Sequence, residues 1–239
     1  MTTSDSGTLL SVELFDDAEC SSILETLQSL ESSWERRWSG LPFFTLGAAS
    51  YLDATEGRFH SYREKAAALN PILREHFGWM YERLEQRLSL LLGRPARCYA
   101  PLGLPGFHIF YAHESFEKQK ASAHYDLQYE LIDWSGLPDP DFVDPLSFTI
   151  PVRLPKSGAG LAVWNLDWNE LRPLGEEERK RKLDENRKPV HEAYAEGRIF
   201  IHSGHRLHQM LPMKNLEGEA RITVQGHGVR TSDGWALYW

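Results

Sequence analysis

The chain has 239 residues, of which 41% are hydrophobic and 12% aromatic, and its formal net charge is −8. A chain of this length and composition can bury a packed globular core. The acidic balance argues against a nucleic-acid partner, because a phosphate backbone requires a basic stripe. We find no run of about 18 apolar residues and no secretory-signal pattern at the start, so we expect a soluble, cytoplasmic protein with no membrane partner.

Residues 1–99 are predicted to be mainly helical and to support residues 100–239 within a single domain, 1–239. In the segment FDDAECSSILETLQSLESSWERRW, apolar residues recur at the spacing of one helix face: Ile23, Leu24, Leu27 and Leu30. Acidic residues precede them, which suits the positive end of a helix dipole. We therefore expect an amphipathic helix in this segment.

A second helix is predicted in the segment NPILREHFGWMYERLEQRLSLLLG, residues 70–93. Pro71 is placed near its start, where a missing N–H is tolerated, and Gly93 at its end. Residues 43–54, FFTLGAASYLDA, have the composition of a strand. The amino-terminal part is thus expected to hold two helices with a strand between them.

From residue 104 onward, short β-rich segments alternate with turn residues. The predicted strands lie within residues 107–113, 122–131, 146–155, 159–168, 196–203, 206–213, 219–229 and 235–239. A charged helical segment, 174–190, interrupts them once as a surface insertion. Strands in this number, without alternating helices, favour a β-sandwich or barrel, so the predicted fold class is α+β and mainly β.

One of these segments, 122–131, contains a His-x-Asp pair, His124 and Asp126. In a strand, residues i and i+2 point to the same face, so the two side chains can offer an imidazole nitrogen and a carboxylate oxygen to one cation. The pair alone is a weak signal. With 10 histidines and 34 acidic residues in the chain, about one such pair is expected by chance.

A third metal ligand is available in the segment GRIFIHSGHRLHQMLPM, residues 197–213, where one strand turns into the next. Three histidines compete for this role. We favour His208, which lies on the second strand, because His205 falls in the turn and His202 ends the first strand. Both remain alternatives at this point.

Arg221 follows thirteen residues after His208, with Thr223 on the same face of the strand. A guanidinium that points into a β-barrel is costly unless it meets an anion, and its planar fork suits a carboxylate. The order His-x-Asp, distant His, then Arg with a hydroxyl two positions later is much more specific than any one of its parts.

This order resembles the iron(II)- and 2-oxoglutarate-dependent dioxygenases, whose fold is the double-stranded β-helix, a cupin-like jelly roll. The resemblance rests on residues 124–126, 197–212 and 221–223 and extends over about residues 100–230. The opening segment LFDDAECSSILETL is also similar to the first helix of the prolyl-4-hydroxylase-like branch. We therefore expect a double-stranded β-helix buttressed by amino-terminal helices.

The resemblance implies that His124, Asp126 and His208 ligate iron(II), and that Arg221, helped by Thr223, holds the distal carboxylate of 2-oxoglutarate. It also places Tyr111 near that carboxylate, where the branch often has a tyrosine hydroxyl. The usual Tyr-x-x-Gly turn is absent after Tyr111.

Two imidazoles and one carboxylate leave three positions on an octahedral iron(II), two for the keto acid and one for O2. The implied reaction is hydroxylation of an unactivated C–H, with release of succinate and CO2, and desaturation or ring closure are alternatives. Because Asp126 is present, no ligand position is vacated for chloride. We expect a small-molecule substrate, either an amino acid or a natural-product intermediate; the sequence leaves a homo-oligomer open.

Two further residues are candidates for substrate contact. Trp164 lies in an alternating strand segment, AVWNL, and His227 follows Arg221 by an even interval on the same predicted strand. The aromatic tail, residues 235–239, is expected either to pack on the core or to form a dimer contact.

Two other classes of protein remain as alternatives. A cupin-like metalloenzyme, an isomerase or hydrolase with zinc or manganese, also uses histidines with a carboxylate. A non-catalytic jelly-roll binding module would use the histidines structurally. A cupin-like enzyme has no need of a buried guanidinium at Arg221, so this residue favours the oxygenase over it. The absence of any bound metal at full occupancy would favour the binding module.

Overall fold

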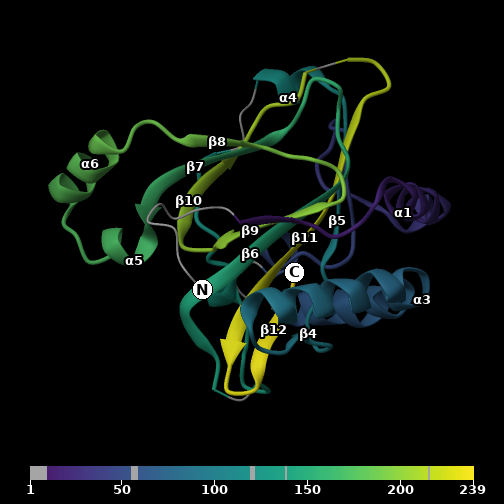
Figure 1. The fold of residues 1–239 in the computed structure, drawn as a ribbon, viewed down its shortest axis with the longest axis horizontal. Coiled ribbons are helices and arrows are strands. Elements are labelled where there is room, and N and C mark those ends of the chain that lie inside the picture. Colours follow the sequence, from purple (N-terminus) through teal and green to yellow (C-terminus); the bar gives the residue numbers. More distant parts are fainter. Residues whose placement is uncertain (1–9, 55–58, 119–121, 138, 215) are drawn as a thin grey trace.

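The computed structural model describes residues 10–54, 59–118, 122–137, 139–214 and 216–239. It has two β-sheets and a set of helices (Figure 1). Within the described residues, the larger sheet has nine strands, with β1, β9, β6, β11, β5, β3 and β2 in that order, β12 beside β11, and β4 beside β12. The smaller sheet has the order β10, β7, β8.

The strands of the larger sheet are β1 (Leu10–Glu13), β2 (Glu35–Arg36), β3 (Phe43–Leu46), β4 (Ala96–Cys98), β5 (Gly106–Tyr111), β6 (Asp141–Arg153), β9 (Arg198–Ser203), β11 (Ala220–Thr231) and β12 (Gly234–Tyr238). Those of the smaller sheet are β7 (Gly160–Asp167), β8 (Val190–Ala193) and β10 (Arg206–Met210). Leu161 and Val163 of β7 cluster with Phe200 of β9, so the two sheets face each other across an interior. This is the predicted mainly β jelly roll.

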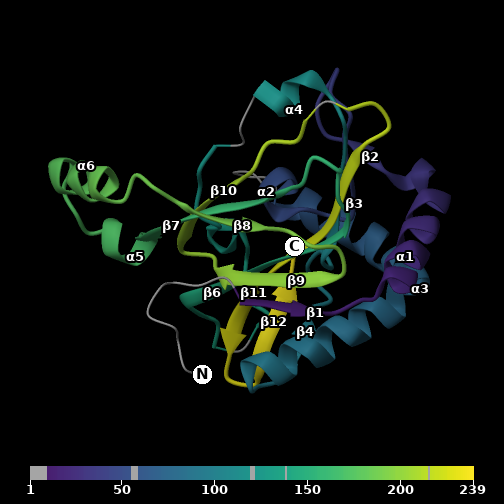
Figure 2. The same cartoon turned by 45° about the horizontal axis from the view of Figure 1, so that its top comes forward.

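Two helices, α1 (Asp17–Ser29) and α3 (Phe59–Leu92), cover the outer face of the larger sheet. The ring of Phe77 on α3 lies 4.8 Å from that of Phe107 on β5, and both are fully buried. Asp16 begins α1 with a capping box, in which its side chain and that of Glu19 each accept a backbone N–H. Figure 2 shows α1 and α3 at the opposite end of the molecule from α5 (Trp168–Leu171) and α6 (Glu176–Glu185).

Two predictions for the amino-terminal part need correction. The second helix begins at Phe59 and not near Pro71, which lies inside α3, and its backbone is kinked at Phe77. The strand predicted over 43–54 ends at Leu46, and a short helix, α2 (Ser50–Asp53), follows. The helix end at Gly93 is confirmed: this glycine has a φ of 66°, a conformation that favours glycine.

The segment 122–131 is not a strand. His124 forms a single bridge with His208, and a 3₁₀ turn, η2 (Gln128–Leu131), follows. The helical insertion predicted over 174–190 is present as α6, and the short helix α5 lies ahead of it, outside the predicted range. The remaining short elements are η1 (Glu31–Ser33) and α4 (Glu114–Lys118). Among the described helices, none has the length and apolar composition of a membrane span.

The aromatic tail packs into the core. Trp239 is fully buried, and its backbone oxygen accepts hydrogen bonds from the Ser50 N–H and the Tyr62 hydroxyl. Its ring lies against Gly106, where a Cβ atom would come within 2.2 Å of the indole. Glycine at this position therefore makes the room that the tail occupies.

Candidate metal centre and anion site

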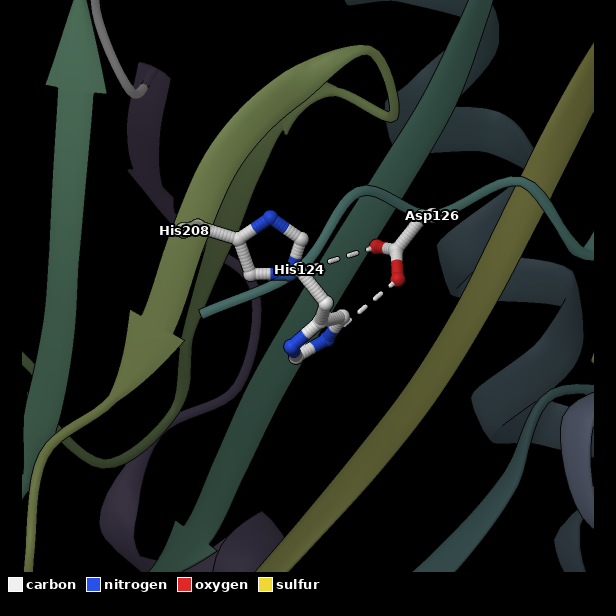
Figure 3. Close-up of side chains that lie close together, drawn as sticks. All are labelled: His124, Asp126 and His208. Atoms are coloured by element: carbon white, nitrogen blue, oxygen red, sulfur yellow. Dashed lines mark ion pairs between the residues drawn. The ribbon is translucent and has the colours of Figure 1, made fainter. Parts of the chain in front are cut away.

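Three side chains converge, His124 and Asp126 from the loop before η2 and His208 from β10 (Figure 3). Asp126 and His208 are buried, and His124 is half exposed. Their donor atoms all lie within 4.8 Å of one another. The Nε2 atom of His124 is 3.7 Å from Oδ1 of Asp126, and that of His208 is 3.5 Å from Oδ2. The structure thus brings together the three residues selected from the sequence.

Backbone hydrogen bonds hold the His-x-Asp segment against β10. The N–H of His124 donates to the carbonyl of His208 at 2.9 Å, and the N–H of His208 donates back at 3.0 Å. The N–H of Asp126 donates to the carbonyl of Gly204 in the turn before β10. An extended segment with this pairing puts both side chains on one face, although it is too short to count as a strand.

The hydrogen bonds of the two imidazoles fix their tautomers. Nδ1 of His124 lies 2.8 Å from the carbonyl of Ser122, and Nδ1 of His208 lies 2.9 Å from that of Arg206. Because a carbonyl oxygen only accepts, each Nδ1 carries the hydrogen and each Nε2 keeps its lone pair. This arrangement orients histidine ligands in metal sites.

The protonation states of Asp126 and His208 also favour cation binding at this point. Burial raises the pKa of the Asp126 carboxyl, but the imidazoles of His208, His227 and His124 lower it by more, so this pKa lies below its ordinary value. Burial lowers the pKa of His208 to about 4, which leaves its imidazole neutral near pH 7. Gln128 on η2 donates from Nε2 to Oδ1 of Asp126 at 3.0 Å and fixes the rotation of the carboxylate.

The two competing histidines are placed differently. His205 hydrogen-bonds the Tyr129 hydroxyl at 2.8 Å and the Asn169 amide at 2.9 Å, so both of its ring nitrogens are used in tying η2 to α5. His202 lies beside the site, with its ring 4.5 Å from that of His208, and its Nδ1 meets the carbonyl of Ser203. Neither belongs to the cluster of donor atoms.

Arg221 points into the interior from β11 and is 2% exposed. One of its terminal nitrogens donates to the carbonyl of Leu211 at 3.2 Å, its Nε is buried without a partner, and the guanidinium lies 4.7 Å from the ring centre of Phe110. In the described part of the chain no carboxylate pairs with it. Burial lowers its pKa to about 10, so it stays charged near pH 7.

A buried, charged guanidinium with an unused donor suits an anionic ligand. Thr223, two residues along β11 and 2% exposed, is on the same face. The structure therefore places Arg221 and Thr223 together, as the sequence predicted.

The prediction for Tyr111 is wrong. Tyr111 follows Phe110 on β5 and points to the opposite face, where it lines a groove with Leu24 and Leu27 of α1 and packs on the outer core. Its register partner, Ala220, is also on that outer face. Its hydroxyl therefore cannot reach a ligand held by Arg221.

Tyr194, which directly follows β8, is the tyrosine that the sequence analysis missed. It packs on Phe200 with ring centres 4.7 Å apart, and its hydroxyl hydrogen-bonds Thr149. Burial raises the pKa of Tyr194 to about 12, while the charges of Arg221 and Asp126 act on it in opposite directions, the first lowering and the second raising it. It therefore faces the interior near both groups. Because β8 was not predicted as a strand, its alternation gave no signal.

Of the two residues predicted to contact substrate, Trp164 points away from the site and His227 faces it. Val163 faces the interior opposite His208, so the next residue, Trp164, points outward, and its indole N–H reaches the carbonyl of Arg187. The expectation that Trp164 lines the cavity is therefore wrong. His227 does face the site, with Nδ1 3.9 Å from Oδ2 of Asp126 and 3.2 Å from Oγ of Ser147.

No protein-family model matches the sequence, and no curated protein does. Solved structures do match. A dioxygenase for N-substituted L-amino acids from Burkholderia ambifaria, in complex with α-ketoglutarate, has a TM-score of 0.56 at 13% identity, over 97% of this chain and 86% of that one. The α-ketoglutarate-dependent epimerase SnoN of nogalamycin biosynthesis gives 0.55 at 14% identity, over 95% and 78%.

A third structure, the α-ketoglutarate-dependent carbocyclase SnoK of nogalamycin biosynthesis, has a TM-score of 0.52 at 12% identity, over 98% of this chain and 93% of that one. The chain has the fold of these non-haem, α-ketoglutarate-dependent enzymes. At such identities the likeness establishes the fold and not the reaction.

Proposed function

We propose that the protein is an iron(II)- and 2-oxoglutarate-dependent oxygenase. One observation carries the proposal: two imidazoles with available Nε2 atoms and an ionised carboxylate meet at one point, and the interior also holds a buried arginine that has no carboxylate partner among the described residues. The shared fold with α-ketoglutarate-dependent enzymes supports it.

The residues fit the metal and the cosubstrate. Two imidazoles and one carboxylate form the facial donor set that non-haem iron(II) prefers, with positions left for a chelating keto acid and O2. Bound iron supplies O2 activation, with 2-oxoglutarate as the electron source that ends as succinate and CO2. His124, Asp126 and His208 hold the metal.

Arg221 and Thr223 bind the distal carboxylate of 2-oxoglutarate, and the hydroxyl of Tyr194 takes the part first predicted for Tyr111. Apolar side chains of the interior, Leu161 and Val163 among them, exclude water around these charges.

The proposed reaction is hydroxylation of an unactivated C–H in a small molecule, an amino acid or a natural-product intermediate. Among the structural neighbours, a dioxygenase acts on N-substituted L-amino acids, and an epimerase and a carbocyclase belong to nogalamycin biosynthesis. His227 is the residue that we propose to contact substrate, since it faces the metal centre without being one of its donors. The narrower assignment to the prolyl-4-hydroxylase-like branch rests on the capped opening helix α1 and is also a proposal.

The test is binding of 2-oxoglutarate to the purified, iron(II)-loaded protein without oxygen, followed by the visible charge-transfer band that a chelated keto acid gives. We expect a band in the wild type, no band in His124→Ala, and a much weakened cosubstrate affinity in Arg221→Leu. Arg153→Leu, an exposed arginine on the neighbouring strand β6, is the matched control and should keep the band. A folded wild type without a band would favour the cupin-like or binding-module alternative.

A further inference from the structure

Four polar side chains line the interior face of the larger sheet between α2 and the anion site. Thr223 on β11 and His108 on β5 are directly opposite each other in the sheet register, and Gln225 follows Thr223 on the same face. Tyr51 reaches them from α2. His108 and Thr223 are 5% and 2% exposed, so their polar atoms depend on one another for hydrogen bonds.

These side chains form a continuous chain of hydrogen bonds. The Tyr51 hydroxyl lies 2.7 Å from Nε2 of His108. The Gln225 side chain hydrogen-bonds the His108 ring, and its Nε2 donates to Oγ1 of Thr223 at 3.5 Å, the longest link.

The direction of each link follows from the donors available. Burial lowers the pKa of His108 to about 3, with the charge of Arg221 acting in the same direction, so the ring is neutral and carries one hydrogen. The Gln225 nitrogen is engaged with Thr223, so the amide oxygen faces His108 and accepts its Nδ1–H. Nε2 of His108 is then an acceptor, and the Tyr51 O–H donates to it.

Thr223 is the last residue of this hydrogen-bond chain. Because Oγ1 of Thr223 already accepts from Gln225, its own hydrogen is available to another acceptor, and Arg221 lies two residues away on the same strand face. We propose that Tyr51, His108 and Gln225 are positioning residues, which together fix the Thr223 hydroxyl as a donor to the distal carboxylate of 2-oxoglutarate. This inference rests on the proposed function.

The helix that carries Tyr51, the first residue of this hydrogen-bond chain, is held in place by several hydrogen bonds. Asp53 at the end of α2 accepts both terminal nitrogens of Arg37, at 2.7 and 2.9 Å, and also the backbone N–H of Ala49 that precedes the helix. Nε of Arg37 donates to Oγ1 of Thr45 on β3 at 2.6 Å. Tyr51 is therefore placed by the fold and needs no ligand to order it.

A double-mutant cycle on 2-oxoglutarate affinity tests the proposal. From the net worth of one hydrogen bond, we expect the dissociation constant to rise about threefold in Tyr51→Phe and about tenfold in Thr223→Val. In the Thr223→Val background, Tyr51→Phe should have no further effect. Tyr81→Phe is the matched control: it removes a buried tyrosine hydroxyl that donates to the Pro105 carbonyl, and it should leave the affinity unchanged.

A second measurement needs neither iron nor cosubstrate. Imidazole ¹⁵N shifts of the metal-free wild type should show His108 neutral with its hydrogen on Nδ1, and Tyr51→Phe should abolish this preference. Independent, additive effects in the cycle, or a hydrogen on Nε2 of His108, would overturn the relay. A wild type that binds no 2-oxoglutarate would overturn the proposed function instead, while the ¹⁵N result still reports on the hydrogen bonds.

Discussion

On one face of β11, Ala220, Ile222 and Val224 pack into the hydrophobic cluster under α1 and α3, whereas on the other face Arg221 and Thr223 line the interior beside the metal centre. Both sets are almost fully buried. Burial of the apolar outer set stabilises the fold. On the inner face a cation and a hydroxyl are buried, and no described residue of opposite charge pairs with the cation, so their burial costs stability. The apolar burial on the outer face thus offsets the cost of burying Arg221 on the inner face.

The largest effect on stability is expected on the outer side. Phe77→Ala removes a fully buried ring that contacts Phe107, and it should lower the free energy of unfolding by about 4 kcal/mol. Urea denaturation measures the loss. The fraction that remains folded should bind 2-oxoglutarate with wild-type affinity, because Phe77 lies behind the sheet. A parallel loss of affinity would show that the two faces are not independent.

The second expected effect is a pH dependence of the free energy of unfolding, caused by the buried His108 on the inner face. His108 has a pKa of about 3 in the folded protein, against about 6.5 when unfolded. Below pH 6.5 the unfolded chain therefore binds a proton that the native protein does not, and stability falls as the pH falls toward 3. The slope from this residue is about 1.4 kcal/mol per pH unit.

His108→Gln should accordingly flatten the decline of unfolding free energy between pH 6.5 and 4 in the metal-free protein. Denaturant titrations at several pH values provide the measurement. An unchanged slope would mean that His108 is not the buried neutral group described here.

The spacing of Arg221, Thr223 and His227 was sufficient to put them on one strand face, and on β11 all three are buried toward the interior. Gly93 and the capped α1 were also readable, because helix ends carry their own chemistry. The start of α3 was not, since Pro71 signals a first turn, yet here tertiary packing of residues from Tyr62 onward sustains a helix through it.

The candidate site shows where such prediction stops. His208 could be chosen over His205 because a turn and a strand are local features. Tyr111 and Trp164 were predicted to face the interior, but in each case it is the neighbouring residue of the strand that does. Which face of a strand is the inner one depends on the pairing of β5 with β11 and of β7 with β10. Those registers join residues far apart in the chain, so no local pattern records them.

A smaller and opposite effect on stability is expected at the arginine of the inner face. Arg221→Met replaces a buried cation, whose Nε has no partner, by an apolar side chain of similar length. We expect the free energy of unfolding to rise by about 1 kcal/mol. The same variant should bind 2-oxoglutarate at least tenfold more weakly by the charge-transfer titration. A destabilised variant would indicate that Arg221 is a structural residue, and the contrast between the faces would fail.

The smallest effect is expected in α6, which belongs to neither face. Its residues are mostly exposed, and Glu178 and Arg181 form a surface pair at 3.3 Å with side chains 50% and 67% exposed. Solvent screens such a pair, so Arg181→Ala should change the free energy of unfolding by less than about 0.5 kcal/mol. It should also leave 2-oxoglutarate affinity unchanged, because the Arg181 side chain is exposed and pairs with Glu178 and Glu185 of the same helix. If that affinity fell severalfold while the unfolding curve stayed the same, α6 would have to reach the site in solution, and it would then belong with the inner face despite its exposure.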